Sequence, residues 1–213
     1  ARHSYNYYNR LVDRDGLPYF NVFWSDPPEA AHDWPDFGDV MSRQWQATIM
    51  ARRMTGEAAP IERVWRDKIL ALIDAGDGLL YRPATRYSQH VADMGDQALT
   101  LYALVTACAD APEDQLRATI VRLVDTLLLK TRQAAIEGAG FLSGFIIKSL
   151  MACARVVGHE PAFELAGLLA RRVFAEQPLF APDNTFRHGG HMHGSLRTLA
   201  GCADYALRAR DPE

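Results

Sequence analysis

Three histidines stand close together in one glycine-rich stretch near the end of the chain. His188, His191 and His193 lie within residues 187–194, separated mainly by glycines. Imidazole binds metal ions, transfers protons or hydrogen-bonds a polar substrate. No known zinc spacing and no neighbouring Cys or Glu set accompanies these histidines, so we expect no metal and no other cofactor. The alternatives are a metal site and a structural loop whose histidines cap the next helix.

Carboxylates form a second group with chemical potential. Asp33, Asp36 and Asp39 directly precede a predicted helix, and Glu137 stands in a glycine-rich break. A carboxyl group held near another one can serve as a general acid, base or nucleophile. The alternative is that Asp39 is the N-cap of the helix that follows and that Glu137 is a solvated helix end.

Arginines and aromatic residues form a third group. Tyr81, Arg82 and Arg86 precede another predicted helix, and arginine recognises carboxylates through two parallel hydrogen bonds. Trp34 belongs to an aromatic-rich stretch at the start of the chain, whose rings suit stacking on a sugar. The alternatives are a surface ion pair for the arginines and simple packing for the aromatic stretch.

The composition is that of a globular chain. It has 213 residues, 48% of them hydrophobic, and a formal net charge of -3 with dispersed basic residues. A nucleic-acid-binding face would need clustered basic residues, and a membrane span would need roughly 20 apolar residues in a row. We therefore expect no nucleic-acid or membrane partner, and a soluble protein located in the cytoplasm rather than the periplasm or outside the cell.

The elements that must position these groups are helices. Apolar residues recur with helical periodicity, and prolines and glycines interrupt them. The predicted helices cover residues 40–55, 60–75, 95–109, 112–135, 141–157, 161–176 and 195–209.

These helices repeat with a period near 50 residues. Prolines that suit the first turn of a helix recur at intervals of 52, 49 and 51: Pro60, Pro112, Pro161 and Pro212. Cysteines recur among small residues in the third, fifth and seventh helices, and we expect all three to be buried thiols: Cys108, Cys153 and Cys202. Such a period is typical of a repeated helical hairpin.

The predicted helices also alternate in character. The third, fifth and seventh are apolar nearly all round, which predicts burial on both sides, while those between them are one-sided and predict an outer layer. Long loops enter the inner helices. In an antiparallel array these loops share one face, beside helix N-termini that suit a polar or anionic ligand.

A double layer of helices with functional loops on one face resembles the (α/α) toroid of six-hairpin glycosidases and related polysaccharide lyases. The resemblance depends on the hairpin period and on residues 32–39, 78–83 and 188–194. It implies an all-α fold, with an aromatic arm over residues 1–36 packed on a toroid domain over 37–213. Six hairpins at this period need about 300 residues, so we expect the toroid to be incomplete here.

The resemblance and the residues together predict a carbohydrate-active enzyme, a glycoside hydrolase acting on an acidic or decorated oligosaccharide. The predicted catalytic residues are Asp36, His191 and His193. The predicted substrate-binding residues are Trp34, Asp39, Tyr81, Arg82, Arg86, Glu137, Arg187 and His188. Two alternatives stay open, a polysaccharide lyase acting on a uronate and a non-catalytic α-solenoid that binds a protein partner. An oligosaccharide or polysaccharide is the expected partner, and a homo-oligomer is left open.

Overall fold

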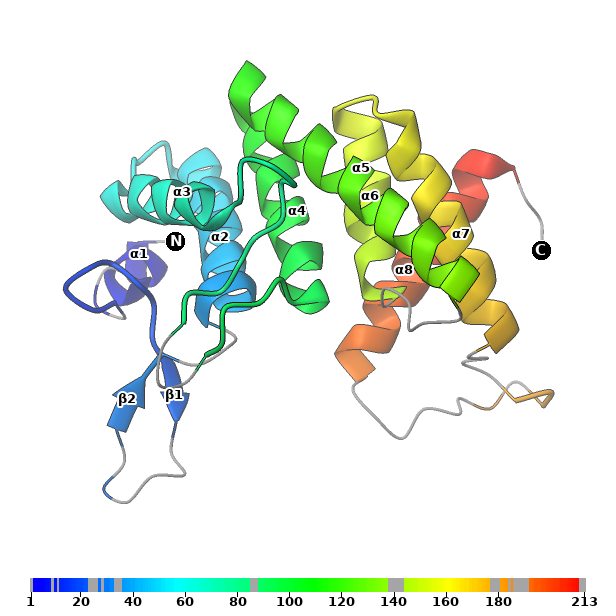
Figure 1. Cartoon of the computed structure of the whole chain (residues 1–213). Coiled ribbons are helices and arrows are strands. Elements are labelled where there is room, and N and C mark those ends of the chain that lie inside the picture. The colour runs from blue at the N-terminus through cyan, green and yellow to red at the C-terminus, as the bar shows by residue number, and fades with distance from the viewer. Residues whose placement is uncertain are drawn as a thin grey trace. The chain divides into compact units, whose positions relative to one another are not determined.

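The computed structural model describes residues 2–8, 10, 12–22, 27, 29–32, 36–84, 88–137, 144–176, 181–183, 185 and 192–210 (Figure 1). Within these ranges the chain forms eight α-helices, one π-helical and one 3-10 turn, and one short antiparallel strand pair. The predicted helical fold class is therefore confirmed. The chain divides into two compact units, Ala1–Glu113 and Asp114–Glu213.

The first unit is built around α2, which packs against both α3 and α4. Its elements are α1 (Arg2–Tyr8), β1 (Phe20–Val22), β2 (Glu29–Ala31), the π-helical turn η1 (Asp36–Val40), α2 (Met41–Thr55), α3 (Pro60–Leu72) and α4 (Met94–Asp110). The two strands pair with Phe20 opposite Ala31. The turn η1 packs against α2 and α4, so it joins the core of this unit.

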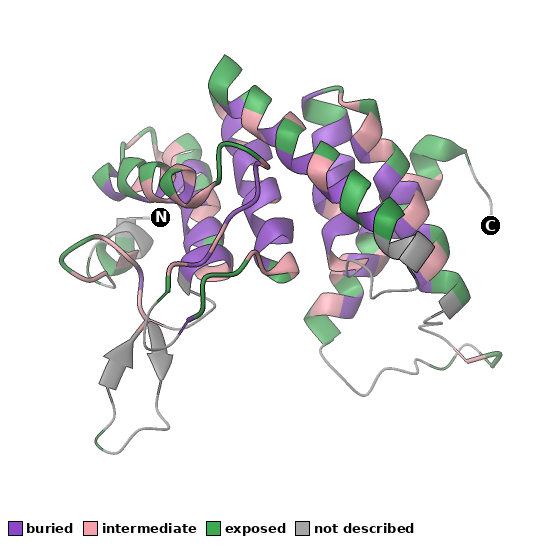
Figure 2. Ribbon diagram, viewed as in Figure 1, coloured by how far each residue is buried: buried purple, intermediate pink, exposed green. Residues whose placement is uncertain are grey.

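The core of the first unit lies between α2, α3 and α4 (Figure 2). Each of the three helices contributes large, fully buried side chains to this core: Trp45, Ile49, Trp65, Ile69, Leu101 and Leu104. In α3 only the side of Ile61, Trp65 and Ile69 is buried, as its one-sided apolar stripe predicts. In α4 most side chains from Asp96 to Cys108 are buried, which agrees with its apolar character all round.

The N-terminal segment contacts α3 through Trp65. The indole Nε1 donates a hydrogen bond to the carbonyl of Gly16 at 3.1 Å, and the ring of Tyr8 meets the indole edge-on at 5.7 Å between centroids. Gly16 has a φ of 79° and lies so close to Val64 that a Cβ there would come within 2.5 Å. The predicted boundary between residues 36 and 37 stays a prediction.

An arginine joins three helix ends in the first unit. Arg52, at the end of α2, donates to Glu62 of α3 at 3.0 Å and to Asp110 at the end of α4, and Arg53 donates to the same Asp110 at 2.6 Å. The hydrogen bonds with Glu62 and then Asp110 hold the pKa of Arg52 above its ordinary value. A half-buried network of this kind is screened less than a single surface pair.

The second unit has α6 packed against both α7 and α8, while α5 lies on α7. Its elements are α5 (Asp114–Glu137), the 3-10 turn η2 (Gly144–Ile146), α6 (Ile147–Val156), α7 (Glu160–Glu176) and α8 (Met192–Ala209). Within each unit, helices two places apart in the chain pack together, α2 with α4, α5 with α7 and α6 with α8. The array of hairpins, its inner and outer layers and the toroid stay predictions.

Small residues allow α6 and α8 to approach closely. A Cβ added at Gly201 of α8 would lie 2.6 Å from the backbone nitrogen of Lys148 and 2.9 Å from the Cβ of Ile147, so only glycine fits there. The neighbouring thiol of Cys202 is buried, as are those of Cys108 and Cys153. The expectation of three buried thiols is confirmed.

Three details of the predicted helices are corrected. The helix expected to reach residue 75 ends at Leu72, because Ile73 pairs with Leu80 in an antiparallel bridge. The helix expected from Pro112 begins at Asp114. The expectation that α8 is buried on both sides is wrong. Its exposed apolar side chains are Met192, Leu196 and Leu207, at 52%, 57% and 80%.

In the described part of the chain, no helix combines the length and the apolar character that crossing a bilayer requires.

Gly201→Ala is expected to destabilise the protein, although alanine is the better helix former by about 1 kcal/mol. The added methyl group collides with the backbone of α6, and overpacking of this kind costs about 1–3 kcal/mol. Urea denaturation of the variant measures the change. The matched control is Ala200→Gly at the exposed neighbouring position, where only helix propensity changes. Equal or higher stability of Gly201→Ala would show that α6 and α8 are not in close contact.

Candidate functional site

In the first unit, buried polar side chains lie where η1, residues 73–84, residues 88–93 and the start of α4 come together. A tight turn begins this arrangement. The Asp74 carboxylate accepts from the backbone N–H of Gly76 at 2.7 Å and of Asp77 at 3.1 Å, and Gly78 has a φ of 74°. The turn reverses the chain so that Leu80 pairs with Ile73. It thereby directs the residues after Leu80 towards α4.

The segment after this turn is fixed to α4 by Gln97. The Gln97 side chain accepts from the Leu80 N–H at 2.9 Å and donates to the Leu80 carbonyl at 2.8 Å. Gln97 and Leu80 are both fully buried. A buried side-chain amide that bonds both the N–H and the C=O of one residue replaces the hydrogen bonds that a neighbouring β-strand would make. The position of Tyr81 and Arg82 is therefore determined by α4.

Arg82 forms a buried ion pair with the first turn of α4. Its Nε lies 2.6 Å from Oδ2 of Asp96, and its Nη2 lies 3.1 Å from Oδ1 of Asp93. Asp96 is 1% exposed and Arg82 is 8% exposed. Asp93 is also the N-cap of α4, because its side chain accepts from the N–H groups of Gly95 and Asp96. One arginine thus connects the loop to a helix cap and to a buried carboxylate.

The loop closes on itself at His90. The ring Nδ1 of His90 lies 3.1 Å from the Arg82 carbonyl, and the Arg82 N–H donates to the carbonyl of Val91 at 3.0 Å. The imidazole stacks on Tyr81 with 5.1 Å between ring centroids. The Tyr81 hydroxyl donates to Asp77 at 2.8 Å, and this hydrogen bond raises the pKa of Tyr81.

Asp96 also contacts η1. A Cβ added at Gly38 would lie 2.3 Å from the Asp96 carboxyl carbon, so the backbone of η1 rests directly on this side chain. Burial raises the pKa of Asp96 to about 6, the Arg82 hydrogen bond and charge act in the opposite sense, and the charges of Asp93 and Asp39 raise it further. Among the described residues, Asp96 Oδ1 is buried without a hydrogen-bond partner. The Asp96 carboxyl group is therefore shielded from water and held between Arg82 and the backbone of η1.

Three of the predicted substrate-binding residues lie in this arrangement: Asp39, Tyr81 and Arg82. Asp39 as an N-cap is wrong, because α2 continues from the π-helical η1 and Asp39 instead pairs with Arg43. Asp36 is the first residue of η1, and nothing is described of its side chain. That Arg82 binds a substrate carboxylate stays a prediction; in this structure its guanidinium holds two carboxylates of the chain itself.

The remaining predicted residues belong to the second unit or lie outside the described residues. His193 is exposed in the first turn of α8, with its ring edge-on to Phe145 at 5.8 Å between centroids. Glu137 is the last residue of α5, without a described side chain. Outside the described residues lie Trp34, Arg86, Arg187, His188 and His191. Asp36 and Arg82 belong to the first unit, and Glu137 and His191 belong to the second. The predicted meeting of all long loops at one face stays a prediction.

Sequence reasoning missed Asp93, Asp96 and Gln97. The available signal was two aspartates three residues apart at the start of an apolar helix, soon after arginines. An aspartate just before a helix is usually interpreted as its N-cap, and of these two aspartates only Asp93 is one. Within the described residues, no three His, Cys, Asp or Glu side chains group together in a way that could hold a metal ion.

Comparison of the chain with protein-family models, with curated proteins and with solved structures gives no match.

Asp96→Asn is expected to change how stability depends on pH. The folded protein holds the Asp96 proton more tightly than the unfolded chain, where the ordinary pKa is 3.8. The unfolding free energy of the wild type therefore falls relative to the variant as pH rises from about 4 to about 6, by roughly 3 kcal/mol, and the difference stays level above that range.

Urea denaturation across this pH range measures the difference, and asparagine keeps an oxygen that can accept from Arg82. Asp15→Asn, at an exposed position, is the control and should show no such trend. A constant difference between wild type and Asp96→Asn at every pH would contradict the raised pKa.

Proposed function

We propose that the protein is a carbohydrate-active enzyme, a glycoside hydrolase that acts on an acidic or decorated oligosaccharide. The observation that supports this most directly is the buried Arg82–Asp96 pair, which lies against Gly38 in the turn that carries Asp36 and Asp39. Burying an ion pair rarely adds stability compared with apolar residues of the same size. Fixing a neighbouring functional segment is a physical reason for keeping such a pair.

Glycoside cleavage needs carboxyl groups held in defined positions. One protonates the leaving oxygen, and a second activates water or attacks the sugar, with a separation that determines the stereochemical outcome. In this proposal Asp36 supplies the acid–base chemistry. Asp96 is a positioning residue, because at 1% exposure it holds the turn and does not touch a sugar. Small errors in such positions cost large factors in rate.

The histidines would position or protonate the substrate. His193 is exposed at the start of α8 and is held from one side by Phe145. His191 acts with it in the proposal, as the preceding histidine of the same glycine-rich stretch. An imidazole titrates near neutral pH, so it can donate or accept a hydrogen bond from a sugar hydroxyl.

The local chemistry favours hydrolysis over elimination. A lyase that uses a tyrosine as base needs that phenol to lose its proton readily. The pKa of Tyr81 is instead raised, because its hydroxyl donates to Asp77.

Asp36→Asn, His191→Ala and His193→Ala are each expected to lower turnover of a uronate-containing oligosaccharide by at least about tenfold, while the melting temperature changes little. Positioned acid–base groups act on rate rather than on folding. The measurement pairs reducing-end release with thermal unfolding for each variant. His159→Ala is the control, since that ring pairs with Asp125 at 2.7 Å.

Product analysis separates the alternatives. Elimination yields an unsaturated product that absorbs in the ultraviolet, and hydrolysis does not. A non-catalytic α-solenoid would release no reducing ends even as wild type. Unchanged turnover in all three variants of an active wild type would place the catalytic residues elsewhere.

A further inference from the structure

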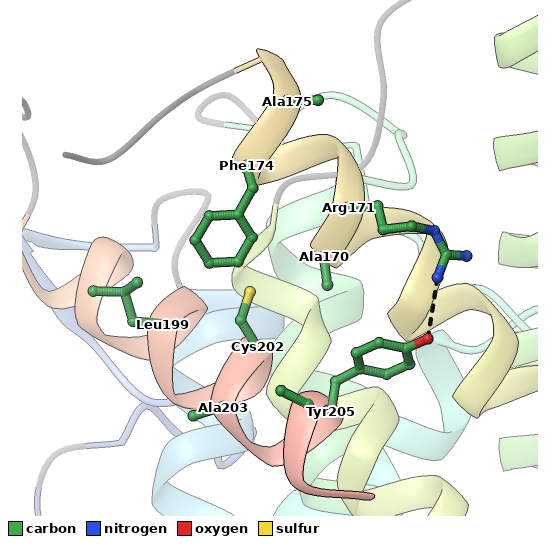
Figure 3. A pocket seen from close by; sticks show the side chains of 9 residues that line it. Ala170, Arg171, Phe174, Ala175, Leu199, Cys202, Ala203 and Tyr205 are labelled. Carbon is green, nitrogen blue, oxygen red and sulfur yellow. Dashed lines mark hydrogen bonds between the residues drawn. The ribbon is translucent and has the colours of Figure 1, made fainter. Parts of the chain in front are cut away.

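An open groove lies between α7 and α8 in the second unit (Figure 3). Its volume is about 720 Å³. Pockets of roughly 300–1,000 Å³ with apolar walls and a few placed polar groups are typical of small-molecule sites. Every lining residue belongs to the two helices, and most are alanine or larger apolar residues. The histidine chemistry proposed above makes no use of this groove.

The polar end of the groove is formed by Tyr205 and Arg171. The ring of Tyr205 rests on Gly167, where an added Cβ would lie 2.5 Å from the hydroxyl oxygen, and it contacts Phe163 at 5.0 Å between centroids. Arg171 Nη1 donates to the Tyr205 hydroxyl oxygen at 3.1 Å, as Figure 3 shows. The two polar groups are therefore aimed together before any ligand arrives, which lowers the entropy cost of binding.

Arg171 brings an uncompensated positive charge to this end. In the described part of the chain it has no carboxylate partner, and its side chain is exposed beside the groove. A guanidinium has five N–H donors in a fixed fork that matches a carboxylate. One donor is used by Tyr205, so the rest suit an anionic group.

The other end and the floor are apolar. Phe174 is 50% exposed, and Leu199 faces it across the groove from α8 (Figure 3). The floor holds Ala170 and the thiol of Cys202, which is only 5% exposed. Burial raises the pKa of Cys202 to about 11, so this thiol stays neutral at physiological pH. An apolar surface of this kind favours an apolar ligand body.

We propose that the groove binds a small apolar carboxylic acid. Its carboxylate lies on Arg171 and the Tyr205 hydroxyl, and its body extends over the floor to Phe174 and Leu199. Tyr205 lies six positions after Leu199 on α8, and this offset corresponds to about 9 Å along the helix axis. That length suits a medium-chain or aromatic acid.

Decanoate and decanol test the carboxylate, because they share an apolar chain and differ in charge. Calorimetric titration of the full chain should show that decanoate binds and that Arg171→Met weakens it by at least about tenfold, since charge-assisted hydrogen bonds are lost. Decanol should bind more weakly to the wild type and be nearly indifferent to Arg171→Met. Arg172→Met removes the neighbouring charge of α7 and should leave decanoate binding unchanged.

A second variant tests the groove itself. Ala203 is an exposed lining residue, so Ala203→Trp fills the space without crowding the core and should abolish binding. Ala200→Trp, exposed on α8 beyond the groove, is the control and should bind decanoate like the wild type.

Three outcomes would overturn the proposal. They are decanoate binding that survives both Arg171→Met and Ala203→Trp, equal binding of decanol and decanoate, and no binding of decanoate at all. A fourth outcome that would overturn the proposal can be measured by sedimentation velocity. A dimer of the wild type that Ala203→Trp converts to a monomer would assign the groove to a second copy of the chain.

Discussion

Two buried charges determine how the first unit is arranged around α4. Arg82 and Asp96 are both nearly removed from water, and either one alone would be very costly there. Arg82 can be buried only where Asp96 and Asp93 lie, and the first turn of α4 offers both, together with a positive dipole end that favours carboxylates. Two segments therefore meet the first turn of α4: residues 80–82, which precede it closely in the chain, and η1, which comes before α2. The same constraint explains why Gly38 must lack a side chain.

Periodicity predicted the helices well because it reports burial along one element. The stripe on α3 and the apolar character of α4 follow from which side chains must leave water, and both are confirmed. Helix ends depend on contacts that periodicity does not contain. Leu72 ends α3 because Ile73 pairs with Leu80, and Asp39 is no cap because a π-helical turn continues into α2. Such ends are determined by residues elsewhere in the chain.

The candidate site was only partly predictable for a related reason. Tyr81 and Arg82 stand out in the sequence because polar and aromatic residues are frequent in the predicted loop to which they belong. Asp96 and Gln97 lie at the start of an apolar helix, and a polar side chain that is buried there needs a partner that the sequence pattern does not identify. Their partners, Arg82 and Leu80, are 14 and 17 residues away in the sequence. Loops of that length can adopt many conformations. Only the folded chain identifies the pair.

In the second unit, small residues have two consequences that the sequence does not separate. Gly201 lets α8 approach α6, and Gly167 leaves room for the ring of Tyr205 against α7. The first contact belongs to the core, while beside the second the alanines and two aromatic rings, Phe174 and Tyr205, line an open groove. Apolar content predicted burial for every side of α8, yet its exposed leucines show that content alone does not decide burial. What decides it is which neighbour each side meets. The side that meets α6 is core, and the side beside Phe174 stays open to a ligand.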